Sequence, residues 1–294
     1  MDLGASRRGV DMGPFAVRYA ELRERLVRLG HDVEDGGNVS VPFREDAARG
    51  AQRGAHYLGA ITSVCRDVAA RTREALDSGR TPLLLGGDHS LATGSIAGAA
   101  AHYAAKGGRL GLIWMDAHAD VNTPASSRSG NVHGMPLAHL LGHGDHDFAA
   151  LAGGTTPAIR NADVALVGIR ELDSAEREHI AQWAVPAFTM KALDERGVRA
   201  VVADAIASAS RDTSALWVSF DLDVVDPTHA PGVGTPVPGG MTYREAHLAM
   251  ELLADSGQLA GLDIVEVNPV LDAKNQTAEL AVELALSAFG KRIV

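Results

Sequence analysis

The segment from residue 109 to residue 120 reads RLGLIWMDAHAD, an almost continuous apolar run that ends in three polar residues at alternate positions. A run that is apolar on both alternating faces is typical of a strand buried on both sides of a parallel sheet. Side chains two apart on an extended chain point the same way, so Asp116, His118 and Asp120 are expected to project together from the carboxyl end of this strand. Ligands bind at that end in open α/β sheets, so the segment indicates a sheet and a site together.

Apolar runs and longer amphipathic stretches alternate along the rest of the chain, as they do in βαβ units. The expected strands are residues 82–86, 109–116, 162–169, 216–221 and 261–267. The expected helices are residues 14–29, 54–78, 91–106, 174–184, 200–210, 242–253 and 276–289. Thr242 and Glu245 form a capping box at the start of one of them. We therefore expect a single three-layer α/β/α domain over residues 1–294, with an open, mostly parallel sheet.

The composition restricts the possible partners. The formal net charge is −10 over 294 residues, which argues against nucleic acid and anionic membrane surfaces because both would be repelled. The apolar runs are shorter than the roughly 20 residues of a membrane-spanning helix, and the first residues lack the apolar stretch of a signal peptide. Cys65 is the single cysteine, so no internal disulfide can form. We expect a cytoplasmic protein without a nucleic-acid or membrane partner.

Two more expected strands end in metal-binding residue types. Asp221 and Asp223 lie at the end of the strand at 216–221, and His89 follows the strand at 82–86. Carboxylates crowded at one sheet edge would raise one another's pKa, and a pair of divalent cations removes that conflict. Carboxylates mixed with imidazoles, without thiolates, suit manganese better than zinc or copper. Two bridged metals can also convert water into a hydroxide nucleophile near neutral pH, so the three strand ends predict a binuclear metal site.

A purely structural role is the alternative for each of these residues. A lone Asp after a strand is most often a turn residue or a helix cap. Asp88 or Ser90 fits such a cap before the helix at 91, and Asp226 fits a turn before Pro227. The strand-end position shared by the Asp116 and Asp221 groups makes that interpretation a poor one for them.

Three histidines elsewhere have helical spacing. His139, His143 and His146 are four and three residues apart, which could suggest a third metal site. Apart from Asp145 and Asp147, nothing acidic or strand-anchored accompanies them, so we expect a solvated helix end without a function.

The chain resembles the arginase branch of the ureohydrolase family nearly from end to end. The resemblance is carried by GGDHS at 86–90, DAHADVN at 116–122 and SFDLD at 219–223. It implies two Mn²⁺ per subunit, with Co²⁺ as a possible substitute. One ion would be held by His89, Asp116, Asp120 and Asp221, and the other by Asp116, His118, Asp221 and Asp223.

Three further segments resemble arginases rather than their relatives: RRGVDMGP at 7–14, SGNVHGMP at 129–136 and LDIVEVNP at 262–269. They imply that Glu266 binds the guanidinium group, and a carboxylate can do so through two parallel hydrogen bonds. A strand-end role before a turn is the alternative for Glu266. The resemblance also implies the remaining contacts with substrate. Asn122 and Ser129, with a weaker contribution from Ser127, would hold the α-carboxylate, Asp173 with Glu176 the α-amino group, and Thr235 the guanidinium end.

The activity that the resemblance implies is hydrolysis of L-arginine to L-ornithine and urea. A metal-bridging hydroxide would attack the guanidinium carbon while Glu266 holds the group, and Asp120 would accept the hydroxide proton. His133 would supply the proton of the departing amine. A lone loop histidine is more often structural, so this role for His133 depends on its segment.

Other functions remain open from the sequence. A different ureohydrolase would act on agmatine, guanidinobutyrate or formiminoglutamate, and a non-catalytic homologue would sense arginine or metal. A deacetylase-type enzyme of related fold would use a single zinc. The family relatives imply a homotrimer or homohexamer. They also begin with a short strand that is missing before Met1, which suggests a start codon placed too far downstream.

Overall fold

The computed structural model describes residues 1–50, 54–151 and 157–292. Its centre is a six-stranded sheet with the order β1-β6-β5-β2-β3-β4, in which all neighbouring strands are parallel. The strands are β1 (Leu83–Leu85), β2 (Leu110–Met115), β3 (Val164–Ile169), β4 (Ala187–Thr189), β5 (Ala215–Asp221) and β6 (Leu259–Val265). The open, parallel sheet predicted from the sequence is confirmed.

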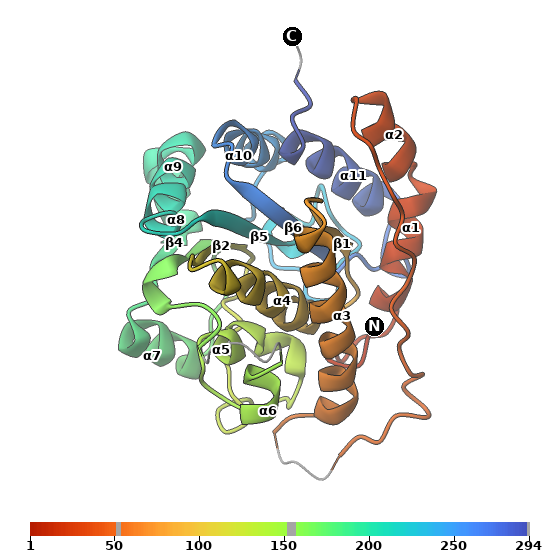
Figure 1. Ribbon diagram of the computed structural model, residues 1–294, viewed down its shortest axis with the longest axis vertical. Coiled ribbons are helices and arrows are strands. Elements are labelled where there is room, and N and C mark those ends of the chain that lie inside the picture. The colour runs from red at the N-terminus through yellow and green to blue at the C-terminus, as the bar shows by residue number, and fades with distance from the viewer. Residues whose placement is uncertain (51–53, 152–156, 293–294) are drawn as a thin grey trace.

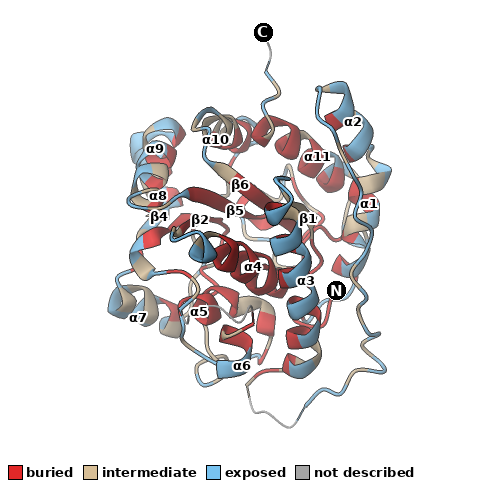
Figure 2. Ribbon diagram, viewed as in Figure 1, coloured by how far each residue is buried: buried red, intermediate tan, exposed pale blue. Residues whose placement is uncertain are grey.

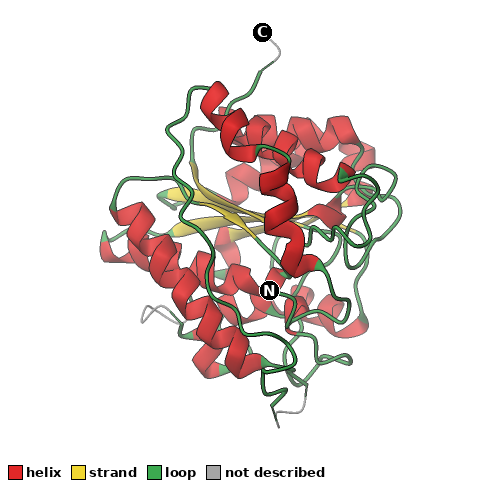
Figure 3. Cartoon of the chain, turned by 90° about the vertical axis from the view of Figure 1, so that its right-hand side faces the viewer, coloured by secondary structure: helices red, strands yellow, loops and turns green. Residues whose placement is uncertain are grey.

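Helices cover both faces of this sheet (Figure 1; Figure 3 shows the strands between the two helical layers). The α-helices are α1 (Gly13–Tyr19), α2 (Leu22–Arg28), α3 (Leu58–Asp77), α4 (Ala92–Ala105), α5 (Pro136–Leu140), α6 (His146–Ala149), α7 (Ser174–Trp183), α8 (Met190–Arg196), α9 (Val198–Ala209), α10 (Tyr243–Asp255) and α11 (Gln276–Ala288). Short 3₁₀ helices are η1 (Val10–Met12), η2 (His89–Leu91), η3 (Val132–Gly134), η4 (Asn161–Asp163) and η5 (Leu222–Val224).

Alternation along β2 divides the apolar core into two halves. Ile113 and Met115 pack with α1, α2 and α8 to α11, whereas Leu112 and Trp114 pack with α3 to α6. All six residues of β2 are buried, because helices cover both of its faces. The buried surfaces of these helices face the sheet in Figure 2. The three-layer arrangement therefore follows from apolar residues on both faces of the central strands.

Some expected elements differ from the structure. The helix expected at 14–29 is two helices, because Glu21 between α1 and α2 has a left-handed backbone with φ of 63°. The edge strand β4 and the helix α8 were not predicted. The other expected strands and helices are present with shifts of a few residues at their ends, and the capping box of Thr242 and Glu245 is confirmed at α10.

The interpretation of His139, His143 and His146 as a solvated helix end is wrong for His139. His139 is fully buried and its Nδ1 lies 2.7 Å from the carbonyl oxygen of Met135. His143 stacks on Trp183 and is half-buried, and the side chain of His146 is 88% exposed. The chain returns against itself after α5, which buries one histidine of the series.

Two of the turn and cap assignments hold. The Asp88 side chain accepts from the backbone N–H of Ser90 at the start of η2, and it also accepts from Gly4 N at 3.0 Å. The Asp226 side chain accepts from the backbone N–H groups of Thr228 and Gly239.

No helix in the described ranges has the length and apolar character needed to cross a membrane.

Candidate metal centre and substrate site

Four neighbouring strands, β1, β6, β5 and β2, bring their carboxyl ends to one edge of the sheet. Asp116 directly follows β2, Asp221 ends β5, His89 begins η2 just after β1, and Glu266 directly follows β6. In a parallel sheet these ends all face the same side, which explains why residues from distant parts of the sequence meet there. The structure thus brings together the groups that the sequence predicted at strand ends.

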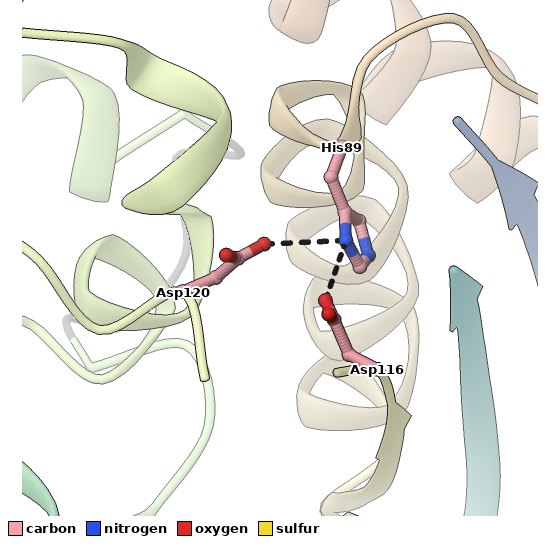
Figure 4. Close-up of side chains that lie close together, drawn as sticks. All are labelled: His89, Asp116 and Asp120. Carbon is pink, nitrogen blue, oxygen red and sulfur yellow. Dashed lines mark ion pairs between the residues drawn. The ribbon is translucent and has the colours of Figure 1, made fainter. Parts of the chain in front are cut away.

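His89 lies at the centre of a group of three aspartates. Its Nδ1 is 3.1 Å from Asp116 Oδ2, 3.2 Å from Asp120 Oδ2 and 3.3 Å from Asp221 Oδ2. Figure 4 shows the imidazole facing the carboxylates of Asp116 and Asp120. The other ring nitrogen, Nε2, lies 2.9 Å from the Ser219 hydroxyl, and the ring stacks on Trp114. These contacts orient Nδ1 toward the carboxylates, because a hydrogen bond at one ring nitrogen fixes the direction of the other.

His118 forms a second group beside the first. Its Nδ1 lies 3.1 Å from Asp223 Oδ2 and 3.3 Å from Asp116 Oδ1. Within the described residues, two sets could each hold a cation: His89, Asp116 and Asp120, and Asp116, His118 and Asp223. Asp116 belongs to both sets, as expected for a bridging carboxylate. Sharing of Asp221 between two ions stays a prediction.

The electrostatics of this cluster fit divalent cations. Burial and neighbouring carboxylates raise the pKa of Asp221 and Asp223, and they raise the pKa of Asp120 to about 6. Burial also raises the pKa of Asp116, but hydrogen bonds to His118 and His89 outweigh it and lower the pKa. Buried like charges at such distances are unfavourable unless cations compensate them. Six imidazole and carboxylate donors without a thiolate are suitable ligands for that purpose.

Glu266 lies beside the cluster and is 1% exposed. Its Oε1 accepts from His89 N at 3.0 Å and lies 3.0 Å from His133 Nδ1. Its Oε2 is buried and has no hydrogen-bond partner among the described residues. A Cβ atom at Gly234 would lie 3.1 Å from that oxygen, so the glycine leaves room next to it. The free acceptor is well placed for a ligand N–H group.

Two carboxylate residues of the site have an unusual backbone. Asp120 has φ of 53° and Glu266 has φ of 62°, both in the left-handed region that non-glycine residues seldom adopt. Such conformations persist where the surrounding structure imposes them, and they concentrate at functional sites. Their presence at these two positions indicates that the fold fixes the two side chains in direction.

A cavity of 440 Å³ opens beside His118 of the cluster. His118, His133 and Thr235 line it, and Thr235 donates to Asp223 Oδ2 at 3.0 Å. Arg7, Asn131 and Glu171 also line the cavity, although none of them was singled out from the sequence. Arg7 and Asn131 lie in segments quoted above, and Glu171 lies two residues before Asp173. Proximity to these predicted positions was therefore the only sequence signal for the three residues.

Some of the residues predicted to bind the amino-acid end of a substrate contact one another in the structure. Asn122 Nδ2 donates to Asp173 Oδ2 at 3.0 Å, and Asp173 caps α7 by accepting from Glu176 N. Burial and the charge of Asp120 raise the pKa of Glu176 to about 7. Ser127 and Ser129 accept hydrogen bonds from backbone N–H groups of their own loop, at Gly130 and Asn131. In the part of the chain that the structure describes, no hydrogen bond joins either serine to the metal cluster.

Comparison with known proteins identifies the family. The model of the arginase family matches residues 1–290. The chain belongs to the arginase family. This membership confirms the enzyme class expected from the sequence, a hydrolase of the ureohydrolase type.

Several arginases resemble the chain over its whole length. The Bacillus caldovelox arginase is 46% identical over 294 residues, which are 100% of this chain and 97% of the relative, and its crystal structure has a TM-score of 0.95. The Bacillus subtilis arginase structure is 43% identical with a TM-score of 0.91, covering 100% of this chain and 97% of that one. An Entamoeba histolytica arginase crystallised with L-ornithine is 29% identical with a TM-score of 0.89, covering 98% and 94%. The arginase fold is therefore shared in full.

Proposed function

We propose that the chain hydrolyses the guanidino group of L-arginine to L-ornithine and urea, with two Mn²⁺ ions as the preferred cofactor and Co²⁺ as a substitute. The observation that carries the proposal is the buried, unpartnered Oε2 of Glu266 beside a cluster that fits two cations. The relatives named arginase support the choice of arginine, and the Entamoeba relative was crystallised with the expected product, L-ornithine.

The proposed ligand sets combine both histidines with the four aspartates. His89, Asp116, Asp120 and Asp221 would hold one ion, and Asp116, His118, Asp221 and Asp223 the other. When bound, two such cations supply Lewis acidity that makes water a nucleophile near neutral pH. The contact of Asp116 with both histidines supports its place in both sets.

Glu266 is the proposed guanidinium-binding residue. Its free Oε2 can accept an N–H of the planar group, and its burial strengthens that charge-assisted hydrogen bond. Thr235, which lines the cavity, would contact the same end of the substrate. Held by these side chains, the guanidinium carbon would lie near the metal-binding carboxylates. The C–O bond would form there first, and the C–N bond to the ornithine nitrogen would break afterwards.

Asp120 and His133 are the proposed proton-transfer residues. Asp120 would accept the proton of the attacking water, because its carboxylate lies within the cluster beside His89. Burial lowers the pKa of His133, but the hydrogen bond and charge of Glu266 raise it to about 9. A protonated His133 can therefore donate to the departing amine nitrogen.

The α-carboxylate and α-amino group of the substrate are assigned to a separate set of residues, which does not line the cavity described above. Asn122 and Ser129, with Ser127, would hold the carboxylate, and Asp173 with Glu176 the amino group. The hydrogen bond between Asn122 and Asp173 supports this arrangement, because it places a carboxylate-binding amide beside an ammonium-binding carboxylate.

A substrate panel tests the proposal. Urea release is measured from arginine, agmatine and guanidinobutyrate after reconstitution with manganese, cobalt or zinc. We expect arginine with manganese to give the highest kcat/KM. Turnover of agmatine without arginine would reassign the substrate, and two bound ions without urea release would favour a sensor.

We also propose a homotrimer or homohexamer of single-domain subunits in the cytoplasm. Exposed apolar side chains support a contact surface: Phe15 is 73%, Tyr19 75% and Val270 63% exposed. Light scattering of the purified chain measures the mass of the assembly, and a monomer would contradict this part of the proposal.

A further inference from the structure

Trp183, at the end of α7, is stacked between two imidazole rings. His143 lies on one side with a centroid distance of 3.8 Å and an interplanar angle of 7°, and His179 on the other at 4.4 Å and 9°. His179 is on α7 itself, whereas His143 belongs to the loop after α5. Stacking on Trp183 fixes the plane of the His179 ring, because rotation would lose the contact.

The His179 ring contacts the loop of residues 119–127, which follows β2 and contains Asp120 and Asn122. His179 Nδ1 lies 2.8 Å from the carbonyl oxygen of Val121. A carbonyl only accepts, so Nδ1 carries the hydrogen. Val121 is fully buried, and its neighbours in the sequence are Asp120 and Asn122. A side chain outside the proposed catalytic set therefore binds the main chain between a metal ligand and a substrate-binding residue.

Helix α7 also contacts the same loop at Asn122. Its N-cap residue Asp173 accepts from Asn122 Nδ2 at 3.0 Å, so α7 contacts Val121 and Asn122 from residues six positions apart in the sequence. Asp120 needs such support because its left-handed φ of 53° is unfavourable for an aspartate. Its own carbonyl accepts from Leu137 N at 3.1 Å, which holds the preceding peptide group, between Asp120 and Val121.

We propose that His179 is a positioning residue for the arginine-hydrolysing site, acting through the Val121 carbonyl to set Asp120 and Asn122, with Trp183 and His143 holding its ring. This inference rests on the proposed function. His179 touches neither the metal ligands nor the cavity; it determines where the Asp120 carboxylate and the Asn122 amide lie when substrate and cations arrive.

Two substitutions separate the hydrogen bond from packing. In H179N the amide N–H takes the place of Nδ1–H and can still reach Val121, while most of the stacking is lost. In H179F the ring stays on Trp183 and the donor is lost. If H179F does not fold, H179Q replaces it, because its amide corresponds to Nε2 and cannot make the bond. H143F, which keeps the stack on the other side, is the matched control.

The readouts are arginine kinetics, L-ornithine affinity by calorimetry and hydrogen exchange of residues 119–127. For H179F we expect kcat/KM and ornithine affinity to fall about tenfold, as for one lost hydrogen bond, and amide exchange in the loop to accelerate. H179N should keep both values within about threefold of the parent, although its melting temperature falls. H143F should resemble the parent.

Two results would overturn the inference. One is an H179F protein with parental kinetics and hydrogen exchange. The other is an equal loss of kcat/KM in H179N and H179F, which would mean that His179 contributes only through packing. If the parent chain releases no urea from arginine, the proposed function fails by itself. The exchange of residues 119–127 in the variants then still decides whether His179 holds the loop.

Discussion

His133 and Glu266 are joined by a hydrogen bond of 3.0 Å between Nδ1 and Oε1. The proposed proton donor is thus bound to the proposed guanidinium-binding residue, although they come from η3 and from the end of β6. Oε1 is also taken by the backbone N–H of His89, so Oε2 is the oxygen left for a ligand. The proposed binding and proton-transfer roles therefore meet at one buried carboxylate.

Replacement of His133 by Asn should separate these two roles. The Asn amide can still donate to Glu266 Oε1, but it cannot release a proton to the leaving amine. We expect kcat to fall about 100-fold or more, as for loss of a general acid, with unchanged metal content. Urea kinetics and elemental analysis measure both. Unchanged turnover would remove His133 from the mechanism, and loss of metal would show a structural role instead.

The Glu266→Gln substitution should weaken binding of the guanidinium group selectively. The neutral amide keeps the size of the side chain but loses the charge that pairs with the cationic ligand. We expect the Kd for arginine to rise about 10- to 100-fold, the range for a hydrogen bond to a charged group. The Kd for ornithine, which has no guanidinium group, should change little. Calorimetry with both ligands on metal-free protein, which does not turn arginine over, is the test, and an equal loss for both would contradict the assignment.

Asn122 should distinguish arginine from agmatine. If its amide holds the α-carboxylate, Asn122→Ala lowers kcat/KM for arginine about tenfold. Agmatine lacks that carboxylate, so its smaller kcat/KM should stay nearly constant. A parallel loss for both substrates would instead indicate that the substitution disturbs Asp173 and the start of α7, which Asn122 also contacts.

Asp116 should be needed for both metal ions, because it contacts both histidines of the cluster. Elemental analysis of the dialysed parent should find two ions per chain, and Asp116→Ala should retain less than one. Asp223→Ala is the matched comparison, since Asp223 contacts only His118 among the two histidines; it should keep one ion. A parent with one ion, or an active Asp116→Ala variant, would refute the binuclear site.

The strand-end residues could be found from sequence because their positions follow a local rule. Asp116, His118 and Asp120 alternate after an apolar run, and His89 and Asp221 occupy the same kind of place, so one topological principle brings them together. The roles of Asn122, Asp173 and Glu266 came from family resemblance. Their contacts depend on which strands become neighbours, which periodicity does not reveal.

Other features had no sequence signal. Strand β4 has three residues, none of them fully buried, so it lacks the apolar run of a central strand. The break at Glu21 lies within a helix-favouring stretch, and a glutamate does not indicate the left-handed backbone that it adopts there. The bond from His179 to Val121 joins a side chain to a carbonyl 58 residues away. Every residue has a backbone carbonyl, so the sequence does not indicate which one accepts a side-chain hydrogen bond.

Burial of His139 should make stability depend on pH. Burial lowers its pKa from 6.5 to about 4 in the folded chain, despite the hydrogen bond to Met135. The unfolded chain takes up a proton below about pH 6.5 while the folded chain stays neutral, so stability is lost as the pH falls from about 6.5 to about 4. The full difference approaches about 3 kcal/mol, and about half of it is reached near pH 5.5. The test is unfolding of metal-free protein with urea between pH 7 and pH 4.5.

The free energy of unfolding of His139→Leu, which cannot titrate, should decline less with falling pH than that of the parent. His146→Leu, at an exposed position, should follow the parent. Parallel curves for the parent and His139→Leu would mean that His139 is protonated as easily in the folded chain as in the unfolded one.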